Sequence, residues 1–177
     1  MLDYAYGCEV EYSIVNLSSV STNLIEDFDC GIDEINKVFK NNPENDFTCK
    51  VFIDNINNRI IGFIAYRSSG IRMTYEKDIV TKSALEISYF ALDNDYQHLP
   101  YNKDYDSYNL SDSILCECLK MFRNLSEEVL YFSYIVLFSV PSAINFYKRN
   151  FFEEFNQYME SDNYTFIDGC IPMFMAL

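Results

Sequence analysis

Apolar positions along the chain switch between a two-residue period, typical of half-buried strands, and a helical period. Val10, Tyr12 and Ile14 alternate as on a strand, whereas Ile114, Cys118 and their apolar neighbours recur on one helical face. Strands with interspersed helices predict an α/β or α+β domain. The predicted strands are Glu9–Val15, Phe47–Asp54, Arg59–Arg67, Ala84–Leu92, Tyr131–Phe138 and a terminal hairpin of Phe151–Met159 with Tyr164–Met175; the predicted helices lie within Leu17–Asp29, Ile32–Lys40, Ser111–Leu125 and Ser142–Asn150.

Two stretches leave the local structure open. Ser68–Lys82 is polar and is either a loop or an extension of the neighbouring strands as a hairpin. Asp93–Leu110 is a long polar and aromatic loop between the strand Ala84–Leu92 and the helix Ser111–Leu125. The second stretch joins the most strongly patterned strand and helix of the chain, so its conformation decides what these two elements can do.

Length and composition favour one globular domain over residues 1–177. The chain has 177 residues, of which 49% are hydrophobic and 17% aromatic, enough for a full core. It contains no apolar run of 18 residues, so we expect no membrane-spanning helix. The first residues lack the basic and apolar regions of a signal peptide, and we therefore expect a cytoplasmic protein.

The cysteines do not form a metal motif. Six cysteines are scattered without a C-x-x-C pair, and the chain has one histidine. Zinc requires clustered thiolate and imidazole ligands. We therefore expect no metal site, and we interpret Cys118 as a core thiol.

The net charge of −14 bears on partners. An acidic protein is repelled by phosphate backbones and by anionic lipid, so nucleic acid and membrane partners are disfavoured. An amine substrate, as a small molecule or on a basic protein or peptide, suits this field better. The alternative is that the charge serves solubility alone.

Three segments carry a family resemblance. They are Phe28–Gly31 followed by Ile35–Asn36, then Tyr89–Asp93 with Asp95–Gln97, and Pro141–Asn150 with Phe152, which contains Ala-x-x-Phe-Tyr. Together they resemble the GNAT family of acetyl-CoA-dependent N-acetyltransferases over nearly the whole chain. The first segment is similar to the opening of a branch that includes toxin-type acetyltransferases.

The resemblance implies a mixed, mostly antiparallel sheet flanked by helices and splayed between the strands near 84–92 and 131–139. It implies that backbone groups of Phe90, Ala91 and Leu92 bind the thioester and pantetheine of acetyl-CoA. The helix N-terminus near Ser111 would hold the pyrophosphate. The residues expected to contact the cofactor are Phe90, Ala91, Leu92, Gln97, Asn109, Leu110, Ser111, Asp112, Asn145 and Phe146.

Two residues are candidates for proton transfer. The resemblance implies that Tyr147 protonates the departing thiolate as general acid; the alternative is a core tyrosine on a helical face. Glu86, on the predicted central strand, is the candidate base for the amine, since a carboxylate in apolar surroundings gains basicity. Its alternatives are a solvated glutamate or a partner of Lys82.

The loop after the strand departs from the family pattern. Gln97 matches the start of the usual glycine-bearing phosphate loop, but no glycine lies between Gly70 and Gly169. Five aspartates and one lysine occupy Asp93–Asp112, and Asp112 in a first helical turn would repel a pyrophosphate. Either the loop folds aside and the cofactor still binds, or the cofactor site has decayed.

The leading hypothesis is an N-acetyltransferase in which an amine attacks acetyl-CoA directly in a ternary complex. One alternative is a GNAT-fold binding or regulatory module with a degenerate cofactor loop. Another is a toxin-like acetyltransferase of a toxin–antitoxin pair. A homodimer formed through the terminal hairpin is an option for any of them.

Overall fold

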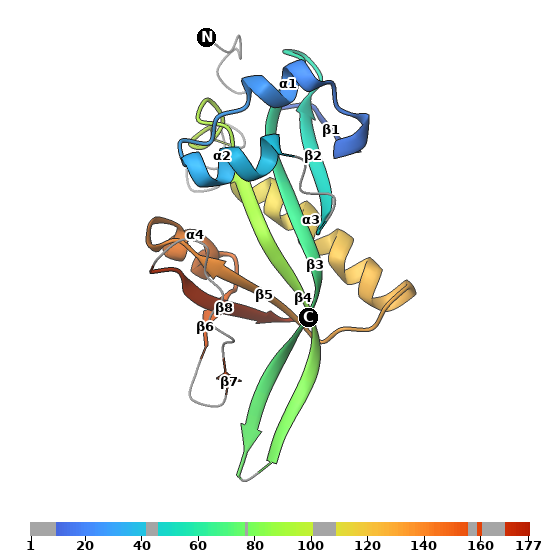
Figure 1. Cartoon of the computed structure of the whole chain (residues 1–177), viewed down its shortest axis with the longest axis vertical. Coiled ribbons are helices and arrows are strands. Elements are labelled where there is room, and N and C mark those ends of the chain that lie inside the picture. Colours follow the sequence, from blue (N-terminus) through green and yellow to red (C-terminus); the bar gives the residue numbers. More distant parts are fainter. Residues whose placement is uncertain (1–9, 42–45, 77, 101–108, 156–158, 161–168) are drawn as a thin grey trace. The chain divides into compact units, whose positions relative to one another are not determined.

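The computed structural model describes residues 10–41, 46–76, 78–100, 109–155, 159–160 and 169–177. The chain divides into two compact units, Met1–Ala65 with Tyr89–Glu117 and Tyr66–Ser88 with Cys118–Leu177. Three long elements contribute residues to both units: β3 (Arg59–Tyr75), β4 (Asp78–Leu92) and α3 (Leu110–Glu128) (Figure 1). That residues 1–177 form a single domain stays a prediction.

The strands are hydrogen-bonded in the order β1–β2–β3–β4–β5–β8–β6, and β7 pairs with β3. The β4–β5 pairing is parallel, whereas the pairings of β1 with β2, β3 with β7, β5 with β8 and β6 with β8 are antiparallel. The predicted α+β class with a mixed, mostly antiparallel sheet flanked by helices is therefore confirmed.

The first unit contains the N-terminal strands and two short helices. Its helix α2 is amphipathic, with Ile35 and Phe39 buried and both termini bearing charges that suit the helix dipole. The rings of Phe39 and Phe63 stack with centroids 4.3 Å apart, and Phe28 packs at 4.8 Å from Phe39. The unit's own elements are β1 (Tyr12–Asn16), η1 (Leu17–Ser19), α1 (Thr22–Asp27), α2 (Asp33–Lys40) and β2 (Thr48–Asp54).

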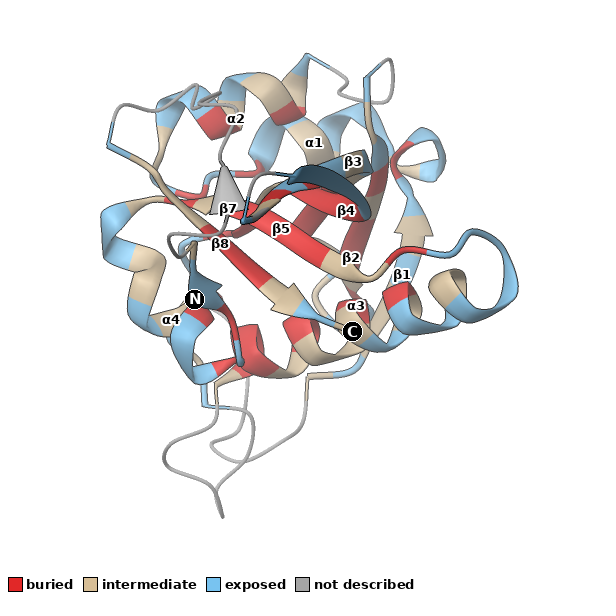
Figure 2. Ribbon diagram, turned by 90° about the horizontal axis from the view of Figure 1, so that it is seen from below, coloured by how far each residue is buried: buried red, intermediate tan, exposed pale blue. Residues whose placement is uncertain are grey.

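The second unit is built on β5, whose sequence Tyr-Ile-Val-Leu-Phe-Ser suits a strand buried on both faces. Figure 2 colours its middle as buried. One sheet face carries a cluster of Ile71, Met73, Ala84, Val136 and Phe174. The unit's own elements are β5 (Tyr134–Ser139), η3 (Pro141–Ala143), α4 (Ile144–Arg149), β6 (Glu153–Glu154), β7 (Met159–Glu160) and β8 (Ile171–Ala176).

The polar stretch Ser68–Lys82 is a hairpin extension and not a loop. Strand β3 continues to Tyr75 and β4 begins at Asp78, so the outer halves of both strands form a two-stranded ribbon. In the terminal region, β6 pairs with β8 in antiparallel fashion. The predicted turn around residues 161–163 lies outside the described residues, so dimerisation through that hairpin stays a prediction.

The parallel register of β4 and β5 runs from Ala84 opposite Tyr134 to Ile87 opposite Leu137. It ends before Phe90–Leu92, the segment whose backbone the sequence predicts to bind acetyl-CoA. No helix in the described part of the chain is long and apolar enough to cross a membrane.

The turn after α4 holds a non-glycine residue in the left-handed region. Asn150 has φ −98°, whereas Phe151 takes the left-handed conformation with φ 69°. Asn150 is buried and its side-chain amide donates a hydrogen bond to the Phe146 carbonyl oxygen over 2.9 Å. The strained residue is therefore the one whose side chain is 82% exposed.

Replacing this residue tests the strain. Both Phe151→Gly and Phe151→Ala remove the exposed ring, but only glycine adopts φ > 0 without a Cβ penalty. We expect the glycine variant to be more stable than the alanine variant by about 1 kcal/mol in urea unfolding. Equal stability of the two variants would show that the backbone stores no strain here.

Candidate active site

Tyr147 lies on the short helix α4, which follows a turn begun by Pro141. Its ring packs against Phe146, with centroids 5.0 Å apart, and against Phe152 at 5.6 Å. The side chain is only 7% exposed. The apolar residues that surround it explain why this helix forms and which way its tyrosine points.

The Tyr147 hydroxyl forms no hydrogen bond with any residue that the structure describes. Within that part of the chain no fully enclosed side-chain oxygen lacks a partner, so this hydroxyl keeps a path to solvent. Burial, followed by the neighbouring Cys118 thiol, raises the pKa of Tyr147 well above its ordinary value. The phenol therefore keeps its proton at neutral pH and has it available for an incoming group.

Glu86 lies on β4 in the same unit, but its surroundings differ from the predicted apolar setting. Its carboxylate forms a 2.8 Å ion pair with Arg67. It also accepts hydrogen bonds from the hydroxyls of Ser88, at 2.9 Å, and Ser69, at 3.3 Å. The ion partner is thus Arg67 and not Lys82. These contacts hold the carboxylate in one orientation on the sheet face that also carries Ala84.

Phe90, Ala91 and Leu92 end β4 in the first unit. Ala91 and Leu92 are buried. A Cβ atom added at Gly62 of β3 would lie 2.4 Å from the Ala91 carbonyl oxygen. Only glycine permits this approach of two strands, so the position of the Ala91 peptide depends on Gly62.

Gln97, predicted to contact the cofactor, is bonded within the protein. Its side-chain amide donates to the carbonyl oxygens of Cys30, at 2.9 Å, and Leu92, at 3.0 Å. It therefore ties the end of β4 to the loop after α1. Its function in this structure is to hold the Leu92 backbone in place.

The N-terminus of α3 is capped by the side chain of Asp112, a residue of its own first turn. The buried Asp112 carboxylate accepts a hydrogen bond from the Asn109 N–H over 3.0 Å. The N–H groups of Asp112 and Ser113 donate to the Asn109 carbonyl oxygen, and that of Leu110 donates to Leu99. Of the first four N–H groups of α3, only that of Ser111 takes no part in these bonds. This end of the helix therefore offers one backbone donor, and not several, to a phosphate.

Two predicted residues on α4 have different surroundings. Asn145 is exposed. The Phe146 ring is partly buried, and the Arg149 guanidinium lies 5.1 Å from its centroid. Neither the exposure of Asn145 nor the ring contact of Phe146 identifies a ligand, so the roles of both residues stay predictions.

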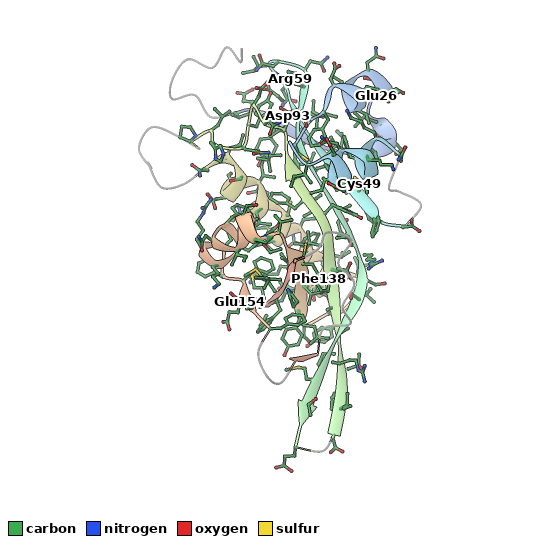
Figure 3. All side chains as sticks on the ribbon, turned by 60° about the vertical axis from the view of Figure 1, so that its left-hand side comes forward. Glu26, Cys49, Arg59, Asp93, Phe138 and Glu154 are labelled. Atoms are coloured by element: carbon green, nitrogen blue, oxygen red, sulfur yellow. The ribbon has the colours of Figure 1, made fainter. Side chains whose placement is uncertain are left out.

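The acidic character of the loop after β4 is partly neutralised. Asp93 is buried, and it accepts hydrogen bonds from the N–H groups of Asp29 and Asp95. Arg59 pairs with Asp95 at 2.6 Å and with Asp93 at 3.5 Å (Figure 3). Arg59 belongs to none of the motifs in the sequence, and only the fold brings it beside these aspartates. Asp104 and Asp106 of the same loop lie outside the described residues.

The opening motif Phe28–Gly31 with Asn36 is structural. Asp29 accepts hydrogen bonds from the Gly31 N–H and the Asn36 amide, and these lower the pKa of its carboxyl group. Asn36 in turn accepts from the Cys30 N–H. The motif shapes the loop after α1. Gln97 donates a hydrogen bond to the Cys30 carbonyl oxygen of this loop, and Asp93 accepts one from its Asp29 N–H, so the loop is held beside the end of β4.

The structure groups the predicted residues by unit. Gln97 contacts Leu92, and Asn109 contacts Asp112, within the first unit. Glu86, Asn145, Phe146 and Tyr147 belong to the second. Among the described residues there is no group of three or more side chains that could hold a metal ion.

No protein-family model and no curated protein matches this chain. Solved structures do, and they show its fold: the chain shares the fold of solved bacterial toxin structures, which is the GNAT fold that its motifs led us to expect.

Three of the similar structures illustrate the likeness. A bacterial toxin has a TM-score of 0.73, with 18% identical residues over 94% of this chain and 90% of the toxin. A tyrosine-to-phenylalanine mutant of the toxin AtaT, bound to the C-terminus of the antitoxin AtaR and acetyl-CoA, has a TM-score of 0.64, with 11% identity over 93% of this chain and 92% of that chain. AtaT complexed with acetyl-methionyl-tRNAfMet has a TM-score of 0.66, with 12% identity over 94% and 95%.

The close approach at Gly62 can be tested with a matched glycine on the same strand. We expect Gly62→Ala to lower the free energy of unfolding by about 1–3 kcal/mol, because its Cβ must displace the Ala91 backbone. Gly70→Ala is the control, since its Cβ would meet the Thr81 methyl at 3.1 Å on the outer ribbon. Urea unfolding measures both. An equal effect of the two changes would contradict the special role of Gly62.

Proposed function

We propose that this protein is an acetyl-CoA-dependent N-acetyltransferase that transfers an acetyl group to an amine. The observation that carries the proposal is the buried Tyr147, whose hydroxyl keeps its proton and has no partner in the described part of the chain. The GNAT fold, shared with a toxin structure that contains acetyl-CoA, supports it.

Acetyl-CoA supplies an activated acetyl group as a thioester. In the proposed reaction, the amine nitrogen bonds to the carbonyl carbon and the carbon–sulfur bond breaks, leaving the electron pair on sulfur. Tyr147 donates its proton to this sulfur as the charge develops. The hydroxyl carries this proton before the reaction begins, because burial raises the pKa of Tyr147.

Glu86 receives the proton that the amine must lose. Arg67, Ser69 and Ser88 hold its carboxylate in one orientation, so that it can accept this proton directly or through one water molecule. We assign it as the general base for this reason, although its surroundings are polar.

The cofactor is held mainly by backbone groups. We propose that Phe90, Ala91 and Leu92 present theirs to the pantetheine arm, with Gly62 and Gln97 fixing the strand. The Ser111 N–H is the group that remains for a phosphate oxygen at the start of α3. Contacts by Asn109, Leu110, Asp112, Asn145 and Phe146 complete the proposed set.

The acceptor amine defines two versions of the proposal. The net charge of −14 favours a small amine or a basic protein or peptide. The likeness to AtaT, complexed with acetyl-methionyl-tRNAfMet, supports a toxin that acetylates a charged tRNA and has an antitoxin as partner. In both versions we propose a cytoplasmic enzyme.

A binding or regulatory module is the second candidate. The observation that favours it is the capped start of α3, where the buried Asp112 carboxylate stands in the first helical turn. A negative charge at this point opposes phosphate binding.

Transfer of labelled acetyl from acetyl-CoA tests the function with three acceptors: a panel of small amines, a lysine-rich peptide and methionyl-tRNA. We expect transfer to one of them. Tyr147→Phe should lower kcat by about 10²–10⁴-fold with little change in KM, because the change removes the acid and keeps the ring. Glu86→Gln should lower kcat similarly while the variant stays folded.

Tyr12→Phe is the matched control, since Tyr12 lies on β1 in the first unit and belongs to neither the proposed site nor the proposed interface. No transfer to any acceptor by the unaltered protein would refute the enzyme. Unchanged turnover of Tyr147→Phe would refute the assignment of the acid only.

A further inference from the structure

The outer half of β4, residues 78–82, is an edge strand in the second unit. Strand β3 lies on one side of it, and β7 pairs with the far side of β3, at Arg72 and Met73. The register with β5 begins only at Ala84. In the described part of the chain, no strand therefore covers the other side of residues 78–82 (Figure 1).

The backbone groups on this side are available for pairing. The Ser83 carbonyl oxygen accepts a hydrogen bond from the Ser133 N–H over 3.1 Å, so Ser83 faces away from β3. Backbone groups of an antiparallel strand alternate in direction, so those of Ile79 and Thr81 face the same way. An edge with free N–H and C=O groups is a template for another strand.

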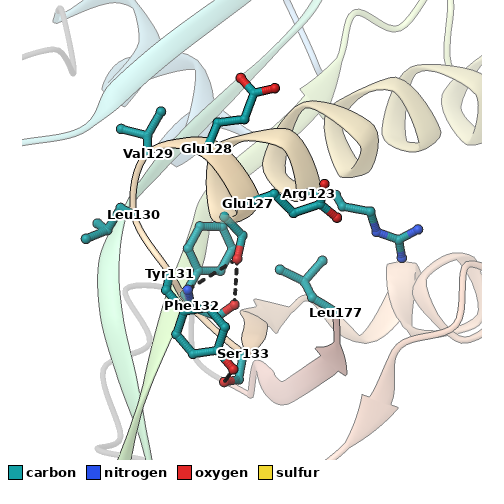
Figure 4. Close-up of a pocket in the computed structure, with 10 residues that line it drawn as sticks. Arg123, Glu127, Glu128, Val129, Leu130, Tyr131, Phe132, Ser133 and Leu177 are labelled. Carbon is teal, nitrogen blue, oxygen red and sulfur yellow. Dashed lines mark hydrogen bonds between the residues drawn. The ribbon is translucent and has the colours of Figure 1, made fainter.

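Exposed apolar side chains gather beside this edge. Five of the eight large exposed hydrophobic residues of the described chain lie on two short segments, 79–80 and 129–131. Tyr131 lies next to the inner end of the edge, because the Ser83 hydroxyl, three residues beyond Val80 on β4, donates to the Tyr131 carbonyl oxygen over 3.2 Å. Figure 4 shows the side chains of Val129 and Leu130 directed away from Leu177. Such a concentration of exposed apolar side chains marks an interaction surface.

The edge sequence Asp-Ile-Val-Thr-Lys is complementary to itself. If two copies pair in antiparallel fashion about Val80, Asp78 of each copy lies opposite Lys82 of the other, and Ile79 lies opposite Thr81. The outward backbone groups of Ile79 and Thr81 then form the hydrogen-bonded pairs, and the Asp78–Lys82 pairs fall at the closer non-hydrogen-bonded positions. Asp78 and Lys82 are exposed and have no partner among the described residues.

We propose that residues 78–82 of β4, with the apolar segment 129–131, form the interface with a second copy of this chain. The two-fold arrangement is closed, so it covers both edges without leading to a filament. A five-residue pairing alone is small beside the roughly 1,600 Å² of a standard interface, and the apolar segment supplies further area. This inference does not depend on the acetyltransferase assignment.

Sedimentation equilibrium of the whole chain and its charge variants tests the proposal. The unaltered protein should show a monomer–dimer equilibrium. Asp78→Lys places two lysines opposite each other at both of the paired sites and should weaken dimerisation about tenfold. Lys82→Asp places two aspartates opposite each other at the same sites and should weaken it to a similar extent. The double variant restores opposite charges at every pair and should recover the original affinity. Glu34→Lys, an equal charge change on exposed α2, should leave it unchanged.

Two outcomes would overturn the proposal. One is a monomer at every concentration, which would also be the result if this edge serves a strand of a different protein. The other is a double variant no stronger than the single variants, because a dimer through another surface would not regain affinity from the exchange. Circular dichroism of each variant checks that it is folded.

Discussion

The buried carboxylate of Asp93 fixes where β4 ends. An isolated charge in this position would be costly, but two backbone N–H groups and Arg59 satisfy it. The Asp93 N–H also donates to the Ile61 carbonyl oxygen on β3. With Gln97 on the Leu92 carbonyl and Gly62 against Ala91, these contacts set the backbone on which the proposed cofactor binding depends.

The helices and strands could be predicted because their signals are local, and the mixed sheet could be predicted because three motifs resemble the GNAT family. Residue periodicity predicted the strands and the long helix, and the Ala-x-x-Phe-Tyr spacing predicted α4 with Tyr147 on its buried side. The partners of charged groups could not be predicted in this way. Arg59 and Asp93 are 34 positions apart, and Arg67 meets Glu86 only because β3 and β4 are neighbouring strands. The opening motif gave a family likeness, but its structural purpose required the bonds of Asp29 and Asn36.

The loop after β4 carries less uncompensated negative charge than its composition indicates. The start of the helix that follows it is less suited to a phosphate than an open helix N-terminus would be. Arg59 offsets Asp93 and Asp95, which a count of aspartates treats as free negative charge. Asp112, in contrast, is a buried cap at the start of α3. The proposed binding of acetyl-CoA therefore relies on backbone groups at the end of β4 more than on a phosphate-binding loop.

That reliance makes cofactor affinity the central question. Isothermal titration of the unaltered protein with acetyl-CoA, and with desulfo-CoA and free adenosine diphosphate as partial ligands, measures it directly. We expect saturable one-site binding of acetyl-CoA, retained in part by the pantetheine-bearing analogue and weak for the diphosphate alone. Absence of acetyl-CoA binding at millimolar concentration would contradict the proposed enzyme.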